Sequence, residues 1–120
     1  MNLNDIKYLI TPGAESLLSK DNNFDFYLNY AIDLINDETG NQFSPAESFT
    51  TDIQWLKIPL AWIIEYLVAR KISGGSETYW QQCLDNYKRS MAILEEHKIQ
   101  KNRAAAKPIL GNIENIYEDI

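Results

Sequence analysis

The fold of this chain is decided by residues 53–72, which read IQWLKIPLAWIIEYLVARKI. At about 100° per residue, as in an α-helix, the first apolar stripe contains Ile53, Leu56, Leu60, Ile63 and Leu67. The second stripe, roughly 100° further round the same helix, contains Trp55, Pro59, Trp62 and Tyr66. The narrow wedge left for water contains Gln54, Lys57, Ala61 and Glu65.

A helix with two apolar stripes has more apolar surface than one small core needs. A helix on the surface of a monomer shows one stripe, and a helix that is apolar most of the way round is buried on several sides. In a chain of 120 residues, a second copy of the same chain could cover the second stripe. We therefore predict that helix 53–72 is central, and that Trp55, Pro59, Trp62 and Tyr66 form a subunit interface.

Pro59 lies inside this predicted helix. Proline has no amide hydrogen to donate, and its ring crowds the preceding helical turn. We expect a continuous helix over residues 53–72 that bends at Pro59.

Two further long helices flank the central one. Residues 23–39 form the first, and Gly40 stands where a left-handed C-terminal cap is expected. A Ser-Gly-Gly-Ser break at residues 73–76 precedes the other, with Ser76 as its N-cap. Its single stripe contains Trp80, Cys83, Leu84, Tyr87, Met91 and Leu94. Because the Gly linker is short, we expect this helix to lie antiparallel to the central one.

The ends of the chain complete the predicted architecture. Short helices are expected over residues 4–9, capped by Asn2 or Asn4, and from Pro12 to Ser19, capped by Thr11. Residues 103–107 can continue the last long helix until Pro108 stops it. The prediction is an all-α bundle of three long helices with short N-terminal helices, as one domain over residues 1–107.

Residues 108–120 form a predicted C-terminal arm. Its apolar residues, spaced mostly three or four apart, are Ile109, Leu110, Ile113, Ile116, Tyr117 and Ile120. Such a segment is too apolar for a free terminus and too short for a core, so we interpret it as an arm that docks on a partner. The alternative is an extension that lies across its own bundle.

The charge pattern points away from nucleic-acid binding. The net charge is −6, whereas proteins that grip nucleic acid neutralise phosphates with Lys and Arg. Residues 1–52 hold nine acids against two lysines, and residues 98–107 hold four basic residues and no acid. This alternation suits pairing between subunits or with a charged partner, and plain solvated surface is the alternative. No run of apolar residues approaches a membrane span, and the single cysteine favours a reducing compartment.

Residues suited to chemistry are few. His97 has no neighbouring Cys or second His, so we expect no metal site, no cofactor and no catalytic residue. Cys83 lies on an apolar stripe and is interpreted as a small buried thiol. Asp33, Asp37 and Glu38 are interpreted as solvated carboxylates. Two alternatives stay open: an enzyme that uses carboxylates alone, and stacking of Trp55, Trp62 and Tyr66 on bases.

The order of these parts resembles the head–tail connector (adaptor) proteins of tailed bacteriophages. The resemblance covers roughly residues 1–100 and lies in three features. They are a long helix that ends in Glu38-Thr39-Gly40-Asn41-Gln42-Phe43, an apolar helix that ends in Ala69-Arg70-Lys71, and a Tyr-rich closing helix that contains Tyr87-Lys88-Arg89-Ser90-Met91-Ala92-Ile93-Leu94. Pro59 and the apolar tail have no counterpart that we can match.

The resemblance implies a structural protein of the virion. Such subunits form a ring, commonly a dodecamer, beneath the portal protein; they extend the DNA channel without sequence-specific DNA binding and give the tail a docking surface. Gly40 and Phe43 would be the junction residues, and the C-terminal arm would reach the portal or a neighbour. The alternative is a small cytosolic helical regulator that dimerises, or another protein-binding module.

Overall fold

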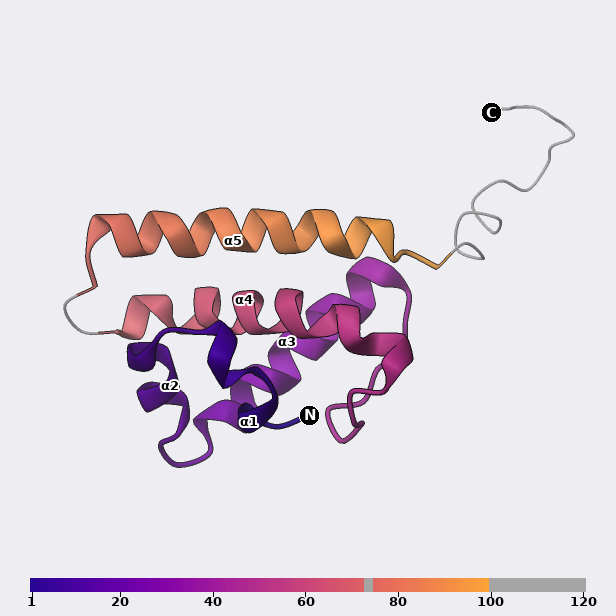
Figure 1. Ribbon diagram of the computed structural model, residues 1–120, viewed down its shortest axis with the longest axis horizontal. Coiled ribbons are helices and arrows are strands. Elements are labelled where there is room, and N and C mark those ends of the chain that lie inside the picture. Colours follow the sequence, from indigo (N-terminus) through magenta and orange to yellow (C-terminus); the bar gives the residue numbers. More distant parts are fainter. Residues whose placement is uncertain (73–74, 100–120) are drawn as a thin grey trace, which may run out of the picture.

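Every regular element in the part of the chain that the computed structural model describes, residues 1–72 and 75–99, is helical (Figure 1), so the predicted all-α class is confirmed. The elements in chain order are α1 (Leu3–Ile6), η1 (Lys7–Leu9), α2 (Pro12–Leu18), α3 (Asn23–Thr39), η2 (Thr51–Leu56), α4 (Lys57–Val68), η3 (Ala69–Lys71) and α5 (Glu77–Glu96); those labelled η are short 3₁₀ helices.

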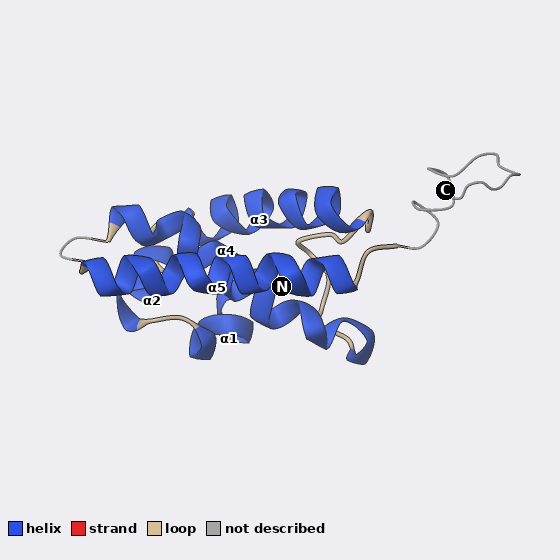
Figure 2. Ribbon diagram, turned by 90° about the horizontal axis from the view of Figure 1, so that it is seen from above, coloured by secondary structure: helices blue, strands red, loops and turns tan. Residues whose placement is uncertain are grey.

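The helix α4 lies at the centre of the bundle. Figure 1 shows α5 running along one side of α4 in the opposite direction, as the short linker predicts. Figure 2, seen from above, shows α3 on one side of this pair and the N-terminal helices α1 and α2 on the other. With neighbours on three sides, α4 has little surface left for solvent.

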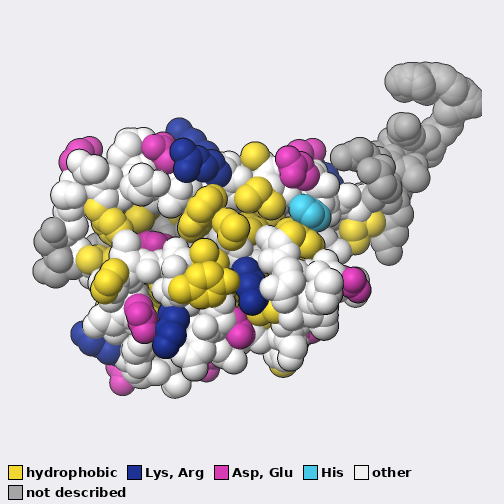
Figure 3. All heavy atoms as spheres, viewed as in Figure 1, with side chains coloured by type: hydrophobic (Ala, Val, Ile, Leu, Met, Phe, Trp, Pro, Cys, Tyr) yellow, Lys and Arg dark blue, Asp and Glu magenta, His cyan; other side chains and the backbone are white. Residues whose placement is uncertain are grey.

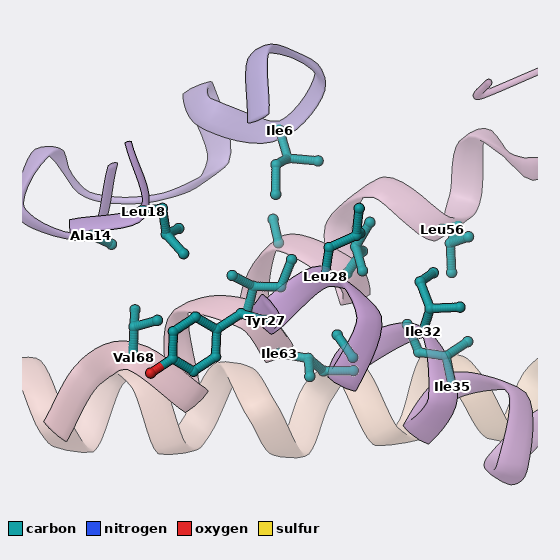
Figure 4. Close-up of a cluster of buried hydrophobic side chains, with 14 of the residues drawn as sticks. Ile6, Ala14, Leu18, Tyr27, Leu28, Ile32, Ile35, Leu56, Ile63 and Val68 are labelled. Atoms are coloured by element: carbon teal, nitrogen blue, oxygen red, sulfur yellow. The ribbon is translucent and has the colours of Figure 1, made fainter. Parts of the chain in front are cut away.

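The core forms where α4 meets these neighbours. Figure 4 shows side chains from the N-terminal helices, α3 and α4 pointing into one shared interior. Its fully buried members include Ile6, Leu18, Ile32, Ile35, Leu56, Leu60, Ile63, Ile64, Val68 and Leu94. Burying a side chain of this size contributes about 1.5–3 kcal/mol. The apolar stripes of all three long helices therefore meet in one core.

Three predicted helix caps, at Thr11, Gly40 and Ser76, are confirmed. The side chain of Thr11 accepts a hydrogen bond from the amide of Ala14, with Pro12 as the first residue of α2. The side chain of Ser76 accepts one from the amide of Tyr79 at the start of α5. Gly40 ends α3 in the left-handed region, with φ of 77°. A side chain at this position would be strained, because L-residues rarely adopt such a φ.

The single bent helix predicted over residues 53–72 is wrong. The segment divides into η2, α4 and η3, and Ile53 leaves the helical region with φ of −120° and ψ of 21°. Pro59 is the third residue of α4. Amides in the first turn of a helix have no partner within the helix, so proline is tolerated there. The chain therefore changes direction before Pro59 rather than at it.

The last helix is shorter than predicted. α5 ends at Glu96, and His97 has non-helical angles, with φ of −108° and ψ of 18°. Beyond it, the amide of Ile99 donates a hydrogen bond to the carbonyl of Thr39 at 2.9 Å. The helix therefore stops at Glu96, and residues 103–107, over which a continuation was expected, lie outside the described residues.

The loop after α3 is fastened by one side chain. The amide nitrogen of Asn36 donates to the carbonyl of Phe43 at 3.0 Å, and the carboxamide oxygen of Asn36 accepts from the amide of Phe43 at 2.9 Å. The ring of Phe43 packs edge-on against Trp55, with centroids 6.0 Å apart. Asn36 therefore sets the path by which the chain passes from α3 to η2.

We predict that Asn36→Ala destabilises the fold by about 1–3 kcal/mol, because two hydrogen bonds to Phe43 are lost together. Urea unfolding followed by circular dichroism measures this change. Asn29→Ala is the control, since Asn29 is exposed on the same helix and its loss should stay within about 0.5 kcal/mol. Equal effects of the two changes would show that the junction does not depend on this pair of bonds.

Candidate interaction surface

The predicted subunit interface is only partly available at the surface. Pro59 is fully buried inside its own chain, so its assignment to a surface contact is wrong. Trp55, Trp62 and Tyr66 are each partly exposed. Ile58, which was not part of the predicted interface, is 41% exposed and lies one helical turn before Trp62.

Aromatic neighbours within the chain cover much of Tyr66. Its ring stacks on Tyr87 at 4.3 Å between centroids and on Trp80 at 5.4 Å. The guanidinium of Arg70 lies over the Trp80 ring at 5.2 Å. Side chains of α5 therefore cover part of the second stripe of residues 53–72. The sequence pattern did not reveal this coverage.

Trp55 is likewise covered on one face. Its ring stacks on His97 with centroids 3.8 Å apart and planes only 5° from parallel. His97 Nδ1 lies 3.0 Å from the carbonyl of Ile93, so the ring is held in place at the end of α5. His97 is thus a packing residue at the C-cap of α5.

Three aromatic side chains that we did not single out are among the most exposed apolar residues described: Tyr8 at 69%, Phe26 at 64% and Tyr30 at 55%. Phe26 and Tyr30 belong to α3, and Asp33 and Asp37 continue the same exposed stripe at helical spacing. A shallow depression of about 310 Å³ is lined by Tyr30, Asp33, Leu34, Asp37 and Glu38. Phe26 and Tyr30 lie off the buried face of α3, which contains Tyr27, Leu28, Ala31, Ile32 and Ile35.

The opposite side of the bundle also presents apolar surface. Figure 3 shows hydrophobic side chains gathered in the middle of the face that carries α1 and α2, with charged side chains around them. Tyr8, in η1, belongs to this N-terminal part of the molecule. Exposed apolar surface bordered by polar residues is typical of sites that bind other proteins.

Among the described residues, the buried carboxylate of Glu65 lies at the centre of a polar cluster that links elements far apart in the sequence. Glu65 is 6% exposed, although the sequence pattern placed it and Ala61 toward water. One carboxylate oxygen of Glu65 accepts from the Thr11 hydroxyl at 2.6 Å and from the Tyr79 hydroxyl at 2.8 Å. The Thr11 amide lies 3.4 Å from the same oxygen. Glu65 therefore joins α2, α4 and α5 through hydrogen bonds.

This cluster is suited to holding the fold rather than to catalysis. Burial raises the pKa of the Tyr79 hydroxyl, and hydrogen bonding to Cys83 and Glu65 raises it further. Burial also raises the pKa of the Cys83 thiol, and Cys83 is only 4% exposed. A protonated, buried thiol is a poor nucleophile. No group of His, Cys, Asp and Glu among the described residues is arranged to hold a metal ion.

The predicted arm residues Ile109, Leu110, Ile113, Ile116, Tyr117 and Ile120 lie outside the described residues. Their docking stays a prediction. Within the described part of the chain, none of the helices has the length and apolar character needed to cross a membrane.

Comparison of the chain with family models, with curated proteins and with solved structures finds no match.

We predict that stability falls above pH 10 and that Tyr79→Phe makes this fall shallower. The folded state raises the pKa of Tyr79 above its ordinary value of 10.0, so above that pH the unfolded chain binds fewer protons and is favoured. Urea midpoints at about pH 8 and about pH 11 measure the effect. Tyr8→Phe, at a 69% exposed tyrosine, should leave the slope unchanged. An identical slope in the Tyr79→Phe protein would contradict the assignment.

Proposed function

We propose that this chain is a structural subunit of a phage head–tail connector, which forms a ring beneath the portal protein, extends the DNA channel and docks the tail. The features that carry the resemblance are organised as a coherent unit. The long helix α3 ends at left-handed Gly40, and Asn36 fixes the following loop at Phe43. The apolar helix α4 is central, and Tyr87 of the closing helix stacks on it through Tyr66.

The observation on which the proposal rests most is apolar surface on separate parts of the molecule. Ile58 and the partly exposed Trp62 project from α4, whereas Tyr8 projects from η1. A ring needs heterologous contacts, in which one patch meets a different patch on the next copy. In this proposal, Ile58 and Trp62 of α4 form one patch of that contact and Tyr8 of η1 forms the other, whereas a two-fold dimer needs only one self-complementary patch.

The charge of the chain is compatible with a DNA channel. A net charge of −6 disfavours tight binding to phosphates, so DNA could pass without being held. In this proposal the subunits reside in the virion at the head–tail interface. The arm over residues 108–120 contacts the portal protein, a neighbouring subunit or a tail component.

We predict that Trp62→Asp yields folded subunits that do not assemble. A buried tryptophan at an interface commonly contributes about 2 kcal/mol or more, so association should weaken roughly thirtyfold. Negative-stain microscopy and sedimentation velocity measure assembly, and circular dichroism checks the fold. Tyr30→Asp is the control, because Tyr30 is an exposed aromatic outside both patches.

Rings that persist in the Trp62→Asp protein would remove Trp62 from the interface. Compact dimers in the unmodified protein would favour a dimeric regulator, and the connector proposal would then be rejected.

We predict that deletion of residues 109–120 reduces capture by the portal or tail partner at least about tenfold, which corresponds to about 1.4 kcal/mol. The melting temperature should fall by only a few degrees, because the core described above lies within residues 1–99. Pull-down and differential scanning calorimetry measure the two effects. A large drop in melting temperature with unchanged capture would place the arm in the core of its own subunit instead.

A further inference from the structure

The outer stripe of α3 combines exposed aromatic and acidic side chains in a fixed order. Phe26 and Tyr30 lie toward the start of the helix, and Asp33 and Asp37 toward its end, all exposed. Among the described residues the one ion pair joins Lys98 and Glu95 on the far helix, at 3.2 Å. The acids of α3 are therefore not paired with any cation of the described chain.

The described chain ends at the C-terminal end of α3. The Ile99 amide donates a hydrogen bond to the carbonyl of Thr39, which is the last residue of α3. Ile99 therefore lies at the end of the helix that carries Asp37 and Glu38 in its last turn. Figure 2 shows that α3 lies on the opposite side of the bundle from α1 and α2.

The sequence of the remaining segment is ordered to match the stripe. Residues 98–107 contain four cations and no acid, and apolar residues recur from Ile109 to Ile120. From Asp37 back to Phe26 the helix rises about 16 Å. Ten residues of extended chain span up to about 33 Å. A segment that starts at Ile99 is therefore long enough to bring its cations to the acids of α3 and its apolar residues to Tyr30 and Phe26.

We propose that in the free subunit residues 101–120 fold back over the outer stripe of their own α3. Lys101, Arg103 and Lys107 then face Asp33, Asp37 and Glu38, and the apolar residues cover Tyr30 and Phe26. The segment of the same chain is the favoured occupant because its tether begins at Thr39, and a short tether gives an effective concentration on the order of millimolar. This inference does not depend on the proposed function.

Cross-linking within the full chain tests the contact. Asn29→Cys on α3 and Asn115→Cys in the segment are combined in a Cys83→Ala background, so that the aromatic, acidic and apolar residues stay intact. A short bismaleimide reagent is added at low protein concentration, and mass spectrometry separates links within a chain from links between chains. Asn4→Cys, at an exposed asparagine of α1, replaces Asn29→Cys as the matched control.

We expect intramolecular links at Asn29→Cys to form at least about fivefold faster than at Asn4→Cys, as a tethered contact of this strength implies. Asp33→Asn with Asp37→Asn should slow them about threefold, and 1 M salt should do the same because the Debye length falls to about 3 Å. Asp52→Asn with Glu77→Gln, at exposed acids elsewhere, should have no effect. Rates that ignore the α3 acids overturn the proposal, and so do links that form only between chains, which would assign the stripe to a second copy.

Discussion

Burial of α4 on three sides is the constraint on which the rest of the structure depends. Leu60, Ile63 and Ile64 are completely buried within a helix of twelve residues. No single neighbour can cover such a helix, so α3, α5 and the N-terminal helices must all pack against it.

The buried carboxylate of Glu65 sets a second condition on the same helix. A carboxylate removed from water is costly unless donors surround it. Thr11 and Tyr79 supply those donors from α2 and α5. The cluster therefore makes the position of the N-terminal helices depend on the register of α5 along α4. Apolar packing alone would leave that register less sharply defined, because one apolar contact can replace another.

Local features of the fold were predictable from the sequence, whereas features that depend on distant partners were not. The caps at Thr11, Gly40 and Ser76 depend on neighbours within a few residues, and the sequence placed them correctly. The burial of Glu65 depends on contacts with residues far along the chain. Periodicity assigned Glu65 to water because a carboxylate usually belongs there, and nothing local shows that Thr11 and Tyr79 will meet it.

The candidate surface shows the same division. Periodicity identified a second apolar stripe, but it could not show that Tyr66 would be covered by Trp80 and Tyr87, or Trp55 by His97. Pro59 was misplaced because the helix begins at Lys57, which moves the proline into its first turn. The exposed pair Phe26 and Tyr30 was within reach of the sequence pattern.

The hydrogen bond from Ile99 to Thr39 also has a mechanical consequence. A pull on the chain at Ile99 is carried into the bundle by this bond, beside the stack of His97 on Trp55. These contacts lie at the end of α5, so tension applied at Ile99 loads them one after another. Tension along the helix axis would instead load all contacts between α5 and α4 together. The end of α5 would therefore peel away under tension while the core around α4 stays closed.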